Sequence, residues 1–229
     1  MRIGILKCGQ SPEVIRASEG DYDDMFVRLL SGRGFEFTSY FVEAMEFPGS
    51  IYDADGWLIT GSRHGVYDDL PFIHPLEEFI RSAFDAEVPL VGICFGHQII
   101  AQALGGTVAK FPGGWAVGAQ TYDFGGTPVT LNAWHQDQVL TAPVSATVTA
   151  CNEFCKNAAL VYGNRAWTVQ AHPEFEDSFI DGLIEHRGGL VPDALLDQAR
   201  DSRGTADSQL IADQIAAFFE QPRNLKRAV

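Results

Sequence analysis

Short apolar runs alternate with helical patterns in the first half of the chain, and this alternation limits the possible folds most. Arg2–Cys8 and Pro89–Ile93 have the length and composition of buried strands, whereas Asp21–Leu30 carries its apolar side chains on one helical stripe. Strands that alternate with helices form βαβ units, in which parallel strands are covered by helices. The same alternation predicts strands at Phe35–Val42 and Gly56–Thr60, and helices at Leu76–Phe84 and Gly96–Leu104.

The pattern changes between Thr107 and Gln170, where Gly, Pro and Asn separate short strand-like runs. Such runs predict added antiparallel strands, at Val117–Tyr122, Pro128–Leu131, Ala146–Thr149, Ala159–Val161 and Ala166–Gln170. Helical patterns return after Pro173, at Phe179–Ile184, Ala194–Ala199 and Leu210–Phe219, before a polar and basic tail, Gln221–Val229. We expect residues 1–229 to form a single α/β domain with an open, mostly parallel sheet flanked by helices, and with a helical C-terminal extension from about residue 176.

Composition narrows the class of protein further. Hydrophobic residues make up 46% of the chain and charged residues 20%, which argues against intrinsic disorder. Sixteen Lys and Arg against 30 Asp and Glu give a net charge of −14, which disfavours nucleic-acid binding. No apolar run reaches the ~18 residues of a membrane span, and the first apolar run is too short for a signal peptide. Four cysteines are too few for a disulfide framework, so we expect a cytoplasmic protein without membrane association.

The segment Gly92–Gly96 reads Gly-Ile-Cys-Phe-Gly and lies where a predicted strand passes into a predicted helix. A nucleophile flanked by glycines at such a junction is the pattern of a nucleophile elbow, whose sharp turn exposes the reactive side chain. The thiol of Cys94 would lie at a helix N-terminus, where the helix dipole favours the reactive thiolate. A buried cysteine beside incidental glycines is the alternative that this short pattern leaves open.

A base for this thiol is predicted in the segment His172-Pro173-Glu174, after the last predicted strand. In extended backbone, residues two apart face the same way, and Pro173 favours that geometry at His172. The Glu174 carboxylate would then fix the imidazole in one tautomer while its other nitrogen faces the thiol of Cys94. Taken alone, the segment is more typical of an ordinary surface His and Glu at a strand end, whereas beside the cysteine elbow a triad is favoured.

The elbow continues into His97 and Gln98, and His172-Pro173-Glu174 follows later in the chain. These motifs, in this order, resemble the class I (triad) glutamine amidotransferase family over roughly Arg2 to Phe175. The stand-alone γ-glutamyl peptidases and the glutaminase domain of GMP synthase are similar members. The resemblance implies a flavodoxin-like fold and attack of a cysteine on the side-chain amide of glutamine. A γ-glutamyl thioester forms, ammonia leaves, and water releases glutamate.

The resemblance also implies a role for each matching residue. Cys94 becomes the nucleophile, His172 the general base and acid, and Glu174 the residue that orients the imidazole. The oxyanion formed by the attack needs preorganised donors. The backbone N–H of Phe95 would be one donor and that of Gly61 the other. An ordinary turn glycine is the alternative for Gly61.

Further residues are implied at the substrate. Gln98 lies one helical turn beyond the cysteine and matches a family glutamine that helps to bind the substrate. The segment His135-Gln136-Asp137 resembles a family segment near the substrate; its alternative is a polar loop that enters a helix. Gln136 stands where synthetase-linked members often carry glycine, and the loop that begins at Gly61 lacks the usual double-glycine-proline. Both departures resemble stand-alone members that cut γ-glutamyl amide bonds.

No cofactor or metal is predicted. The six histidines form no metal-binding pattern, and Cys151 and Cys155 have no further ligands nearby in the sequence. Dinucleotide-binding and phosphate-binding loop motifs are both missing. We interpret Cys8 and His97 as structural residues.

We therefore predict an enzyme that hydrolyses a γ-glutamyl amide bond, in glutamine or in a γ-glutamyl peptide or conjugate, through a Cys94 thioester. Its partner would be this small-molecule substrate. One alternative is a glutaminase subunit that passes ammonia to a separate synthetase. The other is a non-catalytic member that uses Cys94 as a redox sensor. About 50 residues follow Phe175, too few for a synthetase domain of the usual size, which favours the hydrolase.

Overall fold

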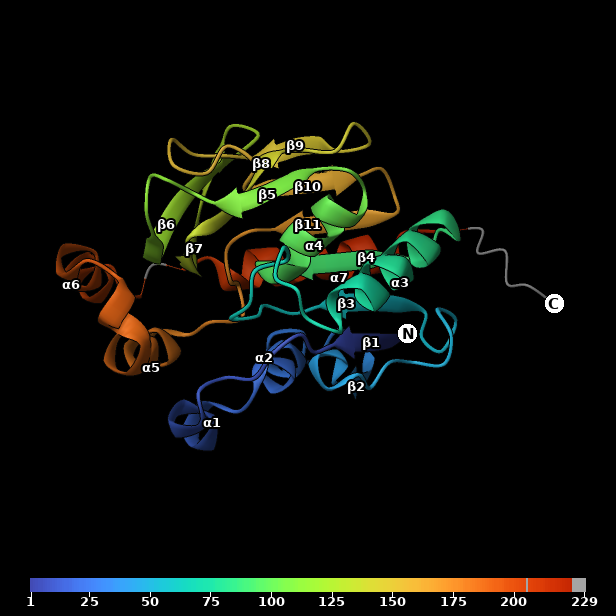
Figure 1. Cartoon of the computed structure of the whole chain (residues 1–229), viewed down its shortest axis with the longest axis horizontal. Helices are drawn as coiled ribbons and strands as arrows, with labels where there is room; N and C mark the ends of the chain where they lie inside the picture. Colours follow the sequence, from blue (N-terminus) through green and yellow to red (C-terminus); the bar gives the residue numbers. More distant parts are fainter. Residues whose placement is uncertain (205, 224–229) are drawn as a thin grey trace.

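Seven strands form the central sheet of the computed structural model, which describes residues 1–204 and 206–223 (Figure 1). Their spatial order is β2 (Glu36–Tyr40), β1 (Arg2–Leu6), β3 (Gly56–Ile59), β4 (Leu90–Ile93), β11 (Ala166–Val169), β10 (Ala159–Tyr162) and β9 (Thr147–Ala150). From β2 to β11 each neighbouring pair is parallel, whereas β10 pairs antiparallel with both β11 and β9. The order of the five parallel strands is that of the flavodoxin-like doubly wound fold. The predicted mostly parallel sheet is confirmed.

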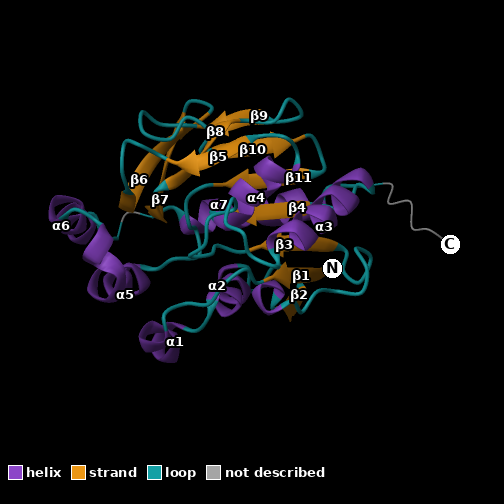
Figure 2. Cartoon of the chain, in the orientation of Figure 1, coloured by secondary structure: helices purple, strands orange, loops and turns teal. Residues whose placement is uncertain are grey.

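Helices cover both faces of the sheet (Figure 2). On one face, Ile5 of β1 shares a buried cluster with Ile215 of α7 (Ser208–Glu220) and with residues of α2 (Tyr22–Leu29). Successive side chains of a strand point to opposite faces. The next residue, Leu6, accordingly shares the cluster of the other face with α3 (Ile73–Asp85) and α4 (Phe95–Ala103). Burial on both faces explains why these strands are continuous apolar runs.

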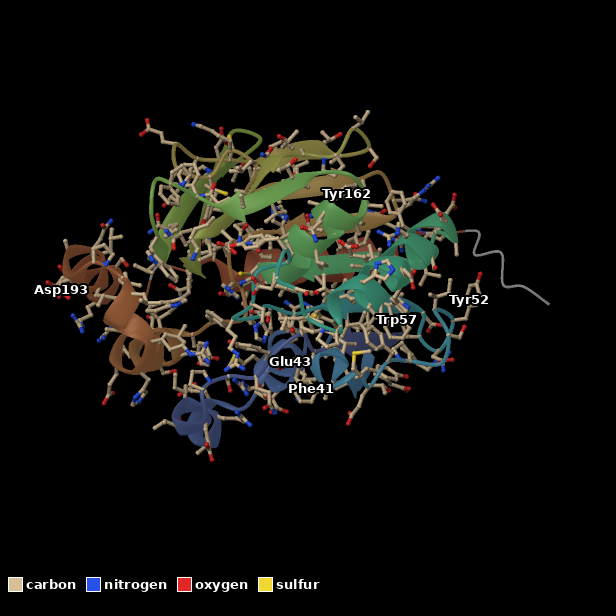
Figure 3. The ribbon with its side chains drawn as sticks, in the orientation of Figure 1. Phe41, Glu43, Tyr52, Trp57, Tyr162 and Asp193 are labelled. Carbon is tan, nitrogen blue, oxygen red and sulfur yellow. The ribbon has the colours of Figure 1, made fainter. Side chains whose placement is uncertain are left out.

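Aromatic packing fixes α3 on the sheet. Trp57 of β3 (Figure 3) is fully buried. Its ring meets that of Phe79 edge to face with centroids 5.0 Å apart. The indole Nε1 donates a hydrogen bond of 2.9 Å to the carbonyl of Ile51. The large ring thus buries its apolar body while its only polar group is paired.

The added antiparallel strands form two separate pairs. β6 (Ala116–Phe124) pairs with β7 (Thr127–His135), and β5 (Thr107–Lys110) pairs with β8 (Asp137–Thr141). The alternative of a loop entering a helix after His135 is wrong, because β8 begins two residues later. Val139 of β8 is buried in the core and pairs with Val108, so tertiary packing determines the strand. The short strand β5 was not predicted.

Three helices at one end of the molecule pack together beside β6. They are α5 (Asp177–Arg187), α6 (Asp193–Asp201) and α1 (Glu13–Glu19), with the short 3-10 helix η2 (Gly188–Leu190) after α5. Their shared cluster includes Ile15, Phe179, Leu183 and Leu196. α1 and the 3-10 helix η1 (Val42–Ala44) were not predicted, because seven residues with Ile15 as the buried side chain give little periodic signal. In the predicted basic tail, positions 224–229 lie outside the described residues. No helix within the described ranges has the length and apolar character of a membrane span.

The junction between β4 and α4 depends on close backbone contact. A Cβ atom on Gly92 would lie 2.5 Å from the carbonyl oxygen of Gly96, and a Cβ atom on Gly96 would overlap the carbonyl oxygen of Ile59. Real Cβ atoms do not approach backbone this closely. Glycine at both positions therefore lets α4 start directly against β3 and β4.

Replacing Gly96 by Ala is expected to lower the free energy of unfolding by about 1–3 kcal/mol, because the new methyl group must displace backbone rather than a flexible side chain. Urea unfolding followed by circular dichroism measures this. Gly49→Ala is the matched control, since its Cβ would meet Asp53 Oδ2 at 3.5 Å and the change should stay within about 0.5 kcal/mol. Equal stabilities for the two variants would contradict the tight junction.

Candidate active site

Cys94 occupies the turn between β4 and α4. Its backbone has φ 53° and ψ −104°, a left-handed φ that non-glycine residues rarely adopt and that costs about 1–3 kcal/mol. The surrounding structure maintains this strain. The Cys94 N–H donates to the Val169 carbonyl at 2.9 Å, and the Cys94 carbonyl accepts from the Gln98 N–H at 3.0 Å. The nucleophile-elbow geometry inferred from the flanking glycines is present.

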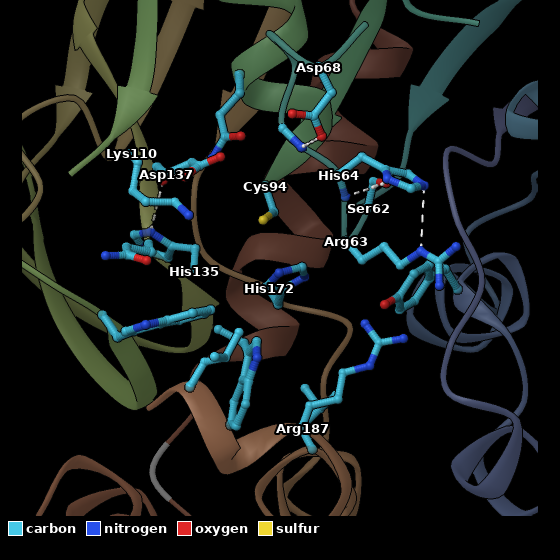
Figure 4. Close-up of a pocket in the computed structure, with 18 of the residues that line it drawn as sticks. Ser62, Arg63, His64, Asp68, Cys94, Lys110, His135, Asp137, His172 and Arg187 are labelled. Carbon is cyan, nitrogen blue, oxygen red and sulfur yellow. Dashed lines mark hydrogen bonds between the residues drawn. The ribbon is translucent and has the colours of Figure 1, made fainter. Parts of the chain in front are cut away.

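His172 lies beside Cys94 and is held from its other side by Glu174 (Figure 4). The imidazole Nδ1 is 2.7 Å from Glu174 Oε1, and the two side chains are 4% and 0% exposed. Between the His172 and Cys94 side chains there is a hydrogen bond. The prediction of extended backbone in this segment is wrong. His172 forms a β-bridge with Asn132, and the chain then turns at Pro173-Glu174. The turn, rather than strand alternation, brings the carboxylate to the ring.

The charge state of His172 follows from opposing effects. Burial lowers the pKa of the imidazole, whereas the negative charges of Glu174 and Cys94 and hydrogen bonds to both raise it. The charges win, and the pKa of His172 rises to about 10. The arrangement therefore favours the protonated form of the His172 ring.

Phe175 and Asn132 complete the support of the imidazole. The Phe175 ring stacks on the His172 ring with centroids 3.8 Å apart and planes within 4°. Asn132 receives the His172 N–H on its carbonyl at 2.8 Å, and its side-chain amide donates to the Phe175 carbonyl at 2.9 Å. These contacts fix the plane of the ring. Sequence reasoning missed both residues, since neither has a motif of its own.

Gly61 and Phe95 both lie close to Cys94. A Cβ atom on Gly61 would lie 2.9 Å from His172 Cε1 and 3.9 Å from Cys94 Cβ, so the loop passes directly over the pair. Phe95 is the first residue of α4, where backbone N–H groups have no partner within the helix.

Two buried amide side chains connect Cys94 to the start of β8. Gln98 Nε2 donates to the Asp137 carbonyl at 2.9 Å and to Gln170 Oε1 at 3.1 Å. Gln170 Nε2 in turn donates to Cys94 Sγ at 3.7 Å. Sequence reasoning missed Gln170; the available signal was a polar residue at the end of an apolar strand, two residues before His172.

A cavity of about 810 Å³ opens above Cys94 (Figure 4). It brings together six of the predicted residues: Cys94, Gln98, His135, Gln136, Asp137 and His172. The Glu174 carboxylate lies behind the imidazole. Asp137 Oδ2 accepts a hydrogen bond of 2.9 Å from the Tyr67 hydroxyl, and burial raises the pKa of this carboxyl.

Two further histidines near the site are uncharged at neutral pH. Burial and the neighbouring His172 lower the pKa of His135 to about 3. Burial likewise lowers the pKa of His97 to about 3, and its Nδ1 lies 2.8 Å from Thr168 Oγ1. His97 does not line the cavity, which agrees with a structural role. In the part of the chain that the structure describes, no three His, Cys, Asp or Glu side chains gather as a metal site.

Comparison with known proteins agrees with this geometry. The family model for class I glutamine amidotransferases matches residues 21–182, more than half of the chain. Gamma-glutamyl peptidase 4 of Arabidopsis thaliana is 30% identical over 189 residues, covering 76% of this chain and 75% of that protein. A gamma-glutamyl-L-1-hydroxyisopropylamide hydrolase of a Pseudomonas species is 32% identical over 170 residues, covering 65% of this chain and 56% of that protein.

The fold is shared with a solved structure. The crystal structure of a glutamine amidotransferase from Methylobacillus flagellatus superposes with a TM-score of 0.77 at 21% identity, covering 100% of this chain and 98% of that one. The family resemblance of the cysteine elbow and the His-Pro-Glu segment is confirmed. The chain therefore belongs to the class I glutamine amidotransferase family.

Proposed function

We propose that this chain hydrolyses γ-glutamyl amide bonds through a covalent thioester on Cys94. The observation that carries the proposal is the strained Cys94 elbow facing an imidazole that Glu174 and Phe175 hold in place. The names of the two relatives support it: both specify a γ-glutamyl group, although one names a peptidase and the other an amide hydrolase. The two names thus share the γ-glutamyl group and differ in the amine that is bound to it.

In the first step, Cys94 Sγ attacks the γ-carbonyl carbon and the carbonyl oxygen becomes an oxyanion. We assign the stabilisation of this charge to the N–H groups of Phe95 and Gly61, and one such donor is typically worth about 10²–10³ in kcat. His172 then gives its proton to the leaving nitrogen, and the C–N bond breaks. A γ-glutamyl thioester and a free amine, or ammonia, result.

In the second step, water replaces the amine. His172, now neutral, removes a proton from water, and the hydroxide adds to the thioester carbonyl. Collapse of this intermediate expels the Cys94 thiolate and releases glutamate. Glu174 holds Nδ1 of the ring throughout both steps. The other ring nitrogen, Nε2, therefore serves first as acid and then as base.

The γ-glutamyl group would bind along the wall formed by the start of β8. Its α-ammonium group requires an anion or carbonyl oxygens, and its α-carboxylate requires a donor. Asp137, Gln136 and Lys110 line this side of the cavity and offer both kinds of group. Gln98 would act chiefly through its hydrogen bond to the Asp137 carbonyl, which positions that wall. His135, buried and neutral, lines the same wall, and its Nδ1 lies 3.1 Å from the Asp137 carbonyl oxygen.

Two other functions would use Cys94 differently. A glutaminase subunit that feeds a separate synthetase would use the same triad but release little glutamate by itself. A redox sensor would need the thiol alone, and the buried pair of His172 and Glu174 would have no task.

All four cysteines are unpaired, which supports a reducing compartment such as the cytoplasm for the proposed activity.

Substituting Cys94 by Ala is expected to abolish glutamate release, with a loss of more than about a thousandfold in kcat. The purified protein is incubated with glutamine, glutathione and a γ-glutamyl alkylamide, and free glutamate is measured. Cys151→Ala is the matched control, since this half-buried thiol lies outside the cavity and its loss should leave turnover unchanged. An active Cys94→Ala protein would disprove the thioester mechanism. No release by the unmodified protein from any substrate would instead favour the synthetase-dependent subunit.

Changing Glu174 to Gln is expected to lower the pKa of His172, because it removes the largest influence that raises this pKa. In the unmodified protein the imidazolium persists until the pH rises through about 10, whereas in the variant the proton is lost at lower pH. NMR titration of the His172 ring measures the midpoint directly. Glu185→Gln, which alters an exposed carboxylate, should leave the midpoint in place. An unchanged midpoint in Glu174→Gln would show that Glu174 does not control the charge of the ring.

A further inference from the structure

We propose that the site is built for γ-glutamyl peptides, in which the leaving amine carries a carboxylate, and that Arg187 binds this carboxylate. The inference rests on the proposed function and specifies its substrate. It concerns the part of the cavity that the γ-glutamyl group would leave free.

The side on which the amine leaves follows from the role of His172. A general acid must contact the atom that it protonates, so the leaving nitrogen lies against His172. Figure 4 shows Arg187 on this side of the site, away from Lys110 and Asp137, which lie on the opposite side. Beyond the imidazole, the cavity is lined by Tyr22, Phe175 and Leu183 as well as by Arg187. The leaving group would therefore enter the part of the cavity that α5 closes.

The guanidinium of Arg187 is available for an anion. Seven other arginines pair with carboxylates: Arg2, Arg33, Arg63, Arg81, Arg165, Arg200 and Arg203. Within residues 1–204 and 206–223, Arg187 makes no hydrogen bond or ion pair, although the chain carries 30 carboxylates. The phenol of Tyr22 interacts electrostatically with it, but burial keeps the pKa of Tyr22 well above 10, so this partner is neutral. A half-buried, uncompensated guanidinium facing a cavity is suited to a carboxylate, which it can bind with two parallel hydrogen bonds.

Arg63 is the competing cation on this side of the site. Its Nη2 lies 3.9 Å from Glu43 Oε1, and its side chain is 60% exposed. Glu43 Oε1 also lies 2.7 Å from His64 Nε2. Arg63 therefore already has a charge partner in Glu43. Solvent and Glu43 both weaken the attraction of Arg63 for an anion, which is why the carboxylate is assigned to Arg187.

The size and rim of the cavity agree with a peptide. About 810 Å³ lies within the range of cavities that hold drug-sized ligands, whereas ammonia needs no space beyond the γ-glutamyl group. Trp115 and Trp134 line the cavity with rings 6.4 Å apart, and Leu190 at its rim is 81% exposed. An amino-acid leaving group with an apolar side chain would cover this surface while its carboxylate reaches Arg187.

A matched pair of substrates isolates the carboxylate. γ-Glutamyl-leucine and its C-terminal carboxamide share the scissile bond and the apolar side chain and differ in one charge. We expect the unmodified protein to have a kcat/KM about ten- to a hundredfold higher for the free acid. Arg187→Met should remove this preference by lowering kcat/KM for the acid alone. Arg187→Lys should restore part of it, and Arg63→Met should keep it.

Each other result overturns the proposal in a recognisable way. Equal losses on acid and carboxamide in Arg187→Met would make Arg187 a structural residue. A preference lost in Arg63→Met but kept in Arg187→Met would assign the carboxylate to Arg63. A preference absent from the unmodified protein would exclude carboxylate recognition altogether, while the proposed hydrolysis would stand. No turnover of either compound or of glutamine would refute the proposed function itself, and with it this inference.

Discussion

The close approach of β3, β4 and α4 is the constraint on which the site depends. Gly92 and Gly96 leave no room for a Cβ atom, so α4 begins directly against the sheet and Cys94 must turn with a left-handed φ. That turn exposes the thiol at the carboxyl ends of the parallel strands and at the N-terminus of a helix. Strain in the backbone, close packing of glycines and the position of the thiol at a helix N-terminus are thus consequences of one junction.

Strand register then brings the imidazole to the thiol. β4 and β11 are parallel neighbours in which Ile93 pairs with Val169, and the Cys94 N–H donates to the Val169 carbonyl. Residues that follow these two strands must meet at the same edge of the sheet. His172 therefore reaches Cys94 although the intervening chain builds two antiparallel strand pairs. The hydrogen bond from the His172 N–H to the Asn132 carbonyl of β7 fixes the turn. The added strands, which separate Cys94 from His172 in the sequence, therefore support the site.

Sequence patterns predicted the part of the molecule in which local signals and packing agree. The parallel strands are apolar because both of their faces are buried, and the elbow is visible because the junction tolerates only glycine at Gly92 and Gly96. Gln170, Phe175 and Arg187 were not foreseen as site residues. A buried glutamine, a stacked phenylalanine and an unpaired arginine look ordinary in a sequence, because their meaning arises from contacts between distant segments. β8 was hidden for the same reason: its pairing with β5 outweighs a weak local pattern.

The cavity is lined by three Lys and Arg side chains, although the chain as a whole is acidic. A net charge of −14 repels anionic ligands at long range, and a γ-glutamyl peptide carries two carboxylates. Lys110, Arg63 and Arg187 line a single cavity together with Asp68 and Asp137, so cations lie close to the place where we propose that such a ligand binds. At separations below the Debye length of about 8 Å, these nearby cations act more strongly than the distant, screened surface charge. Selectivity in this protein would therefore be decided inside the cavity rather than by electrostatic steering from solution.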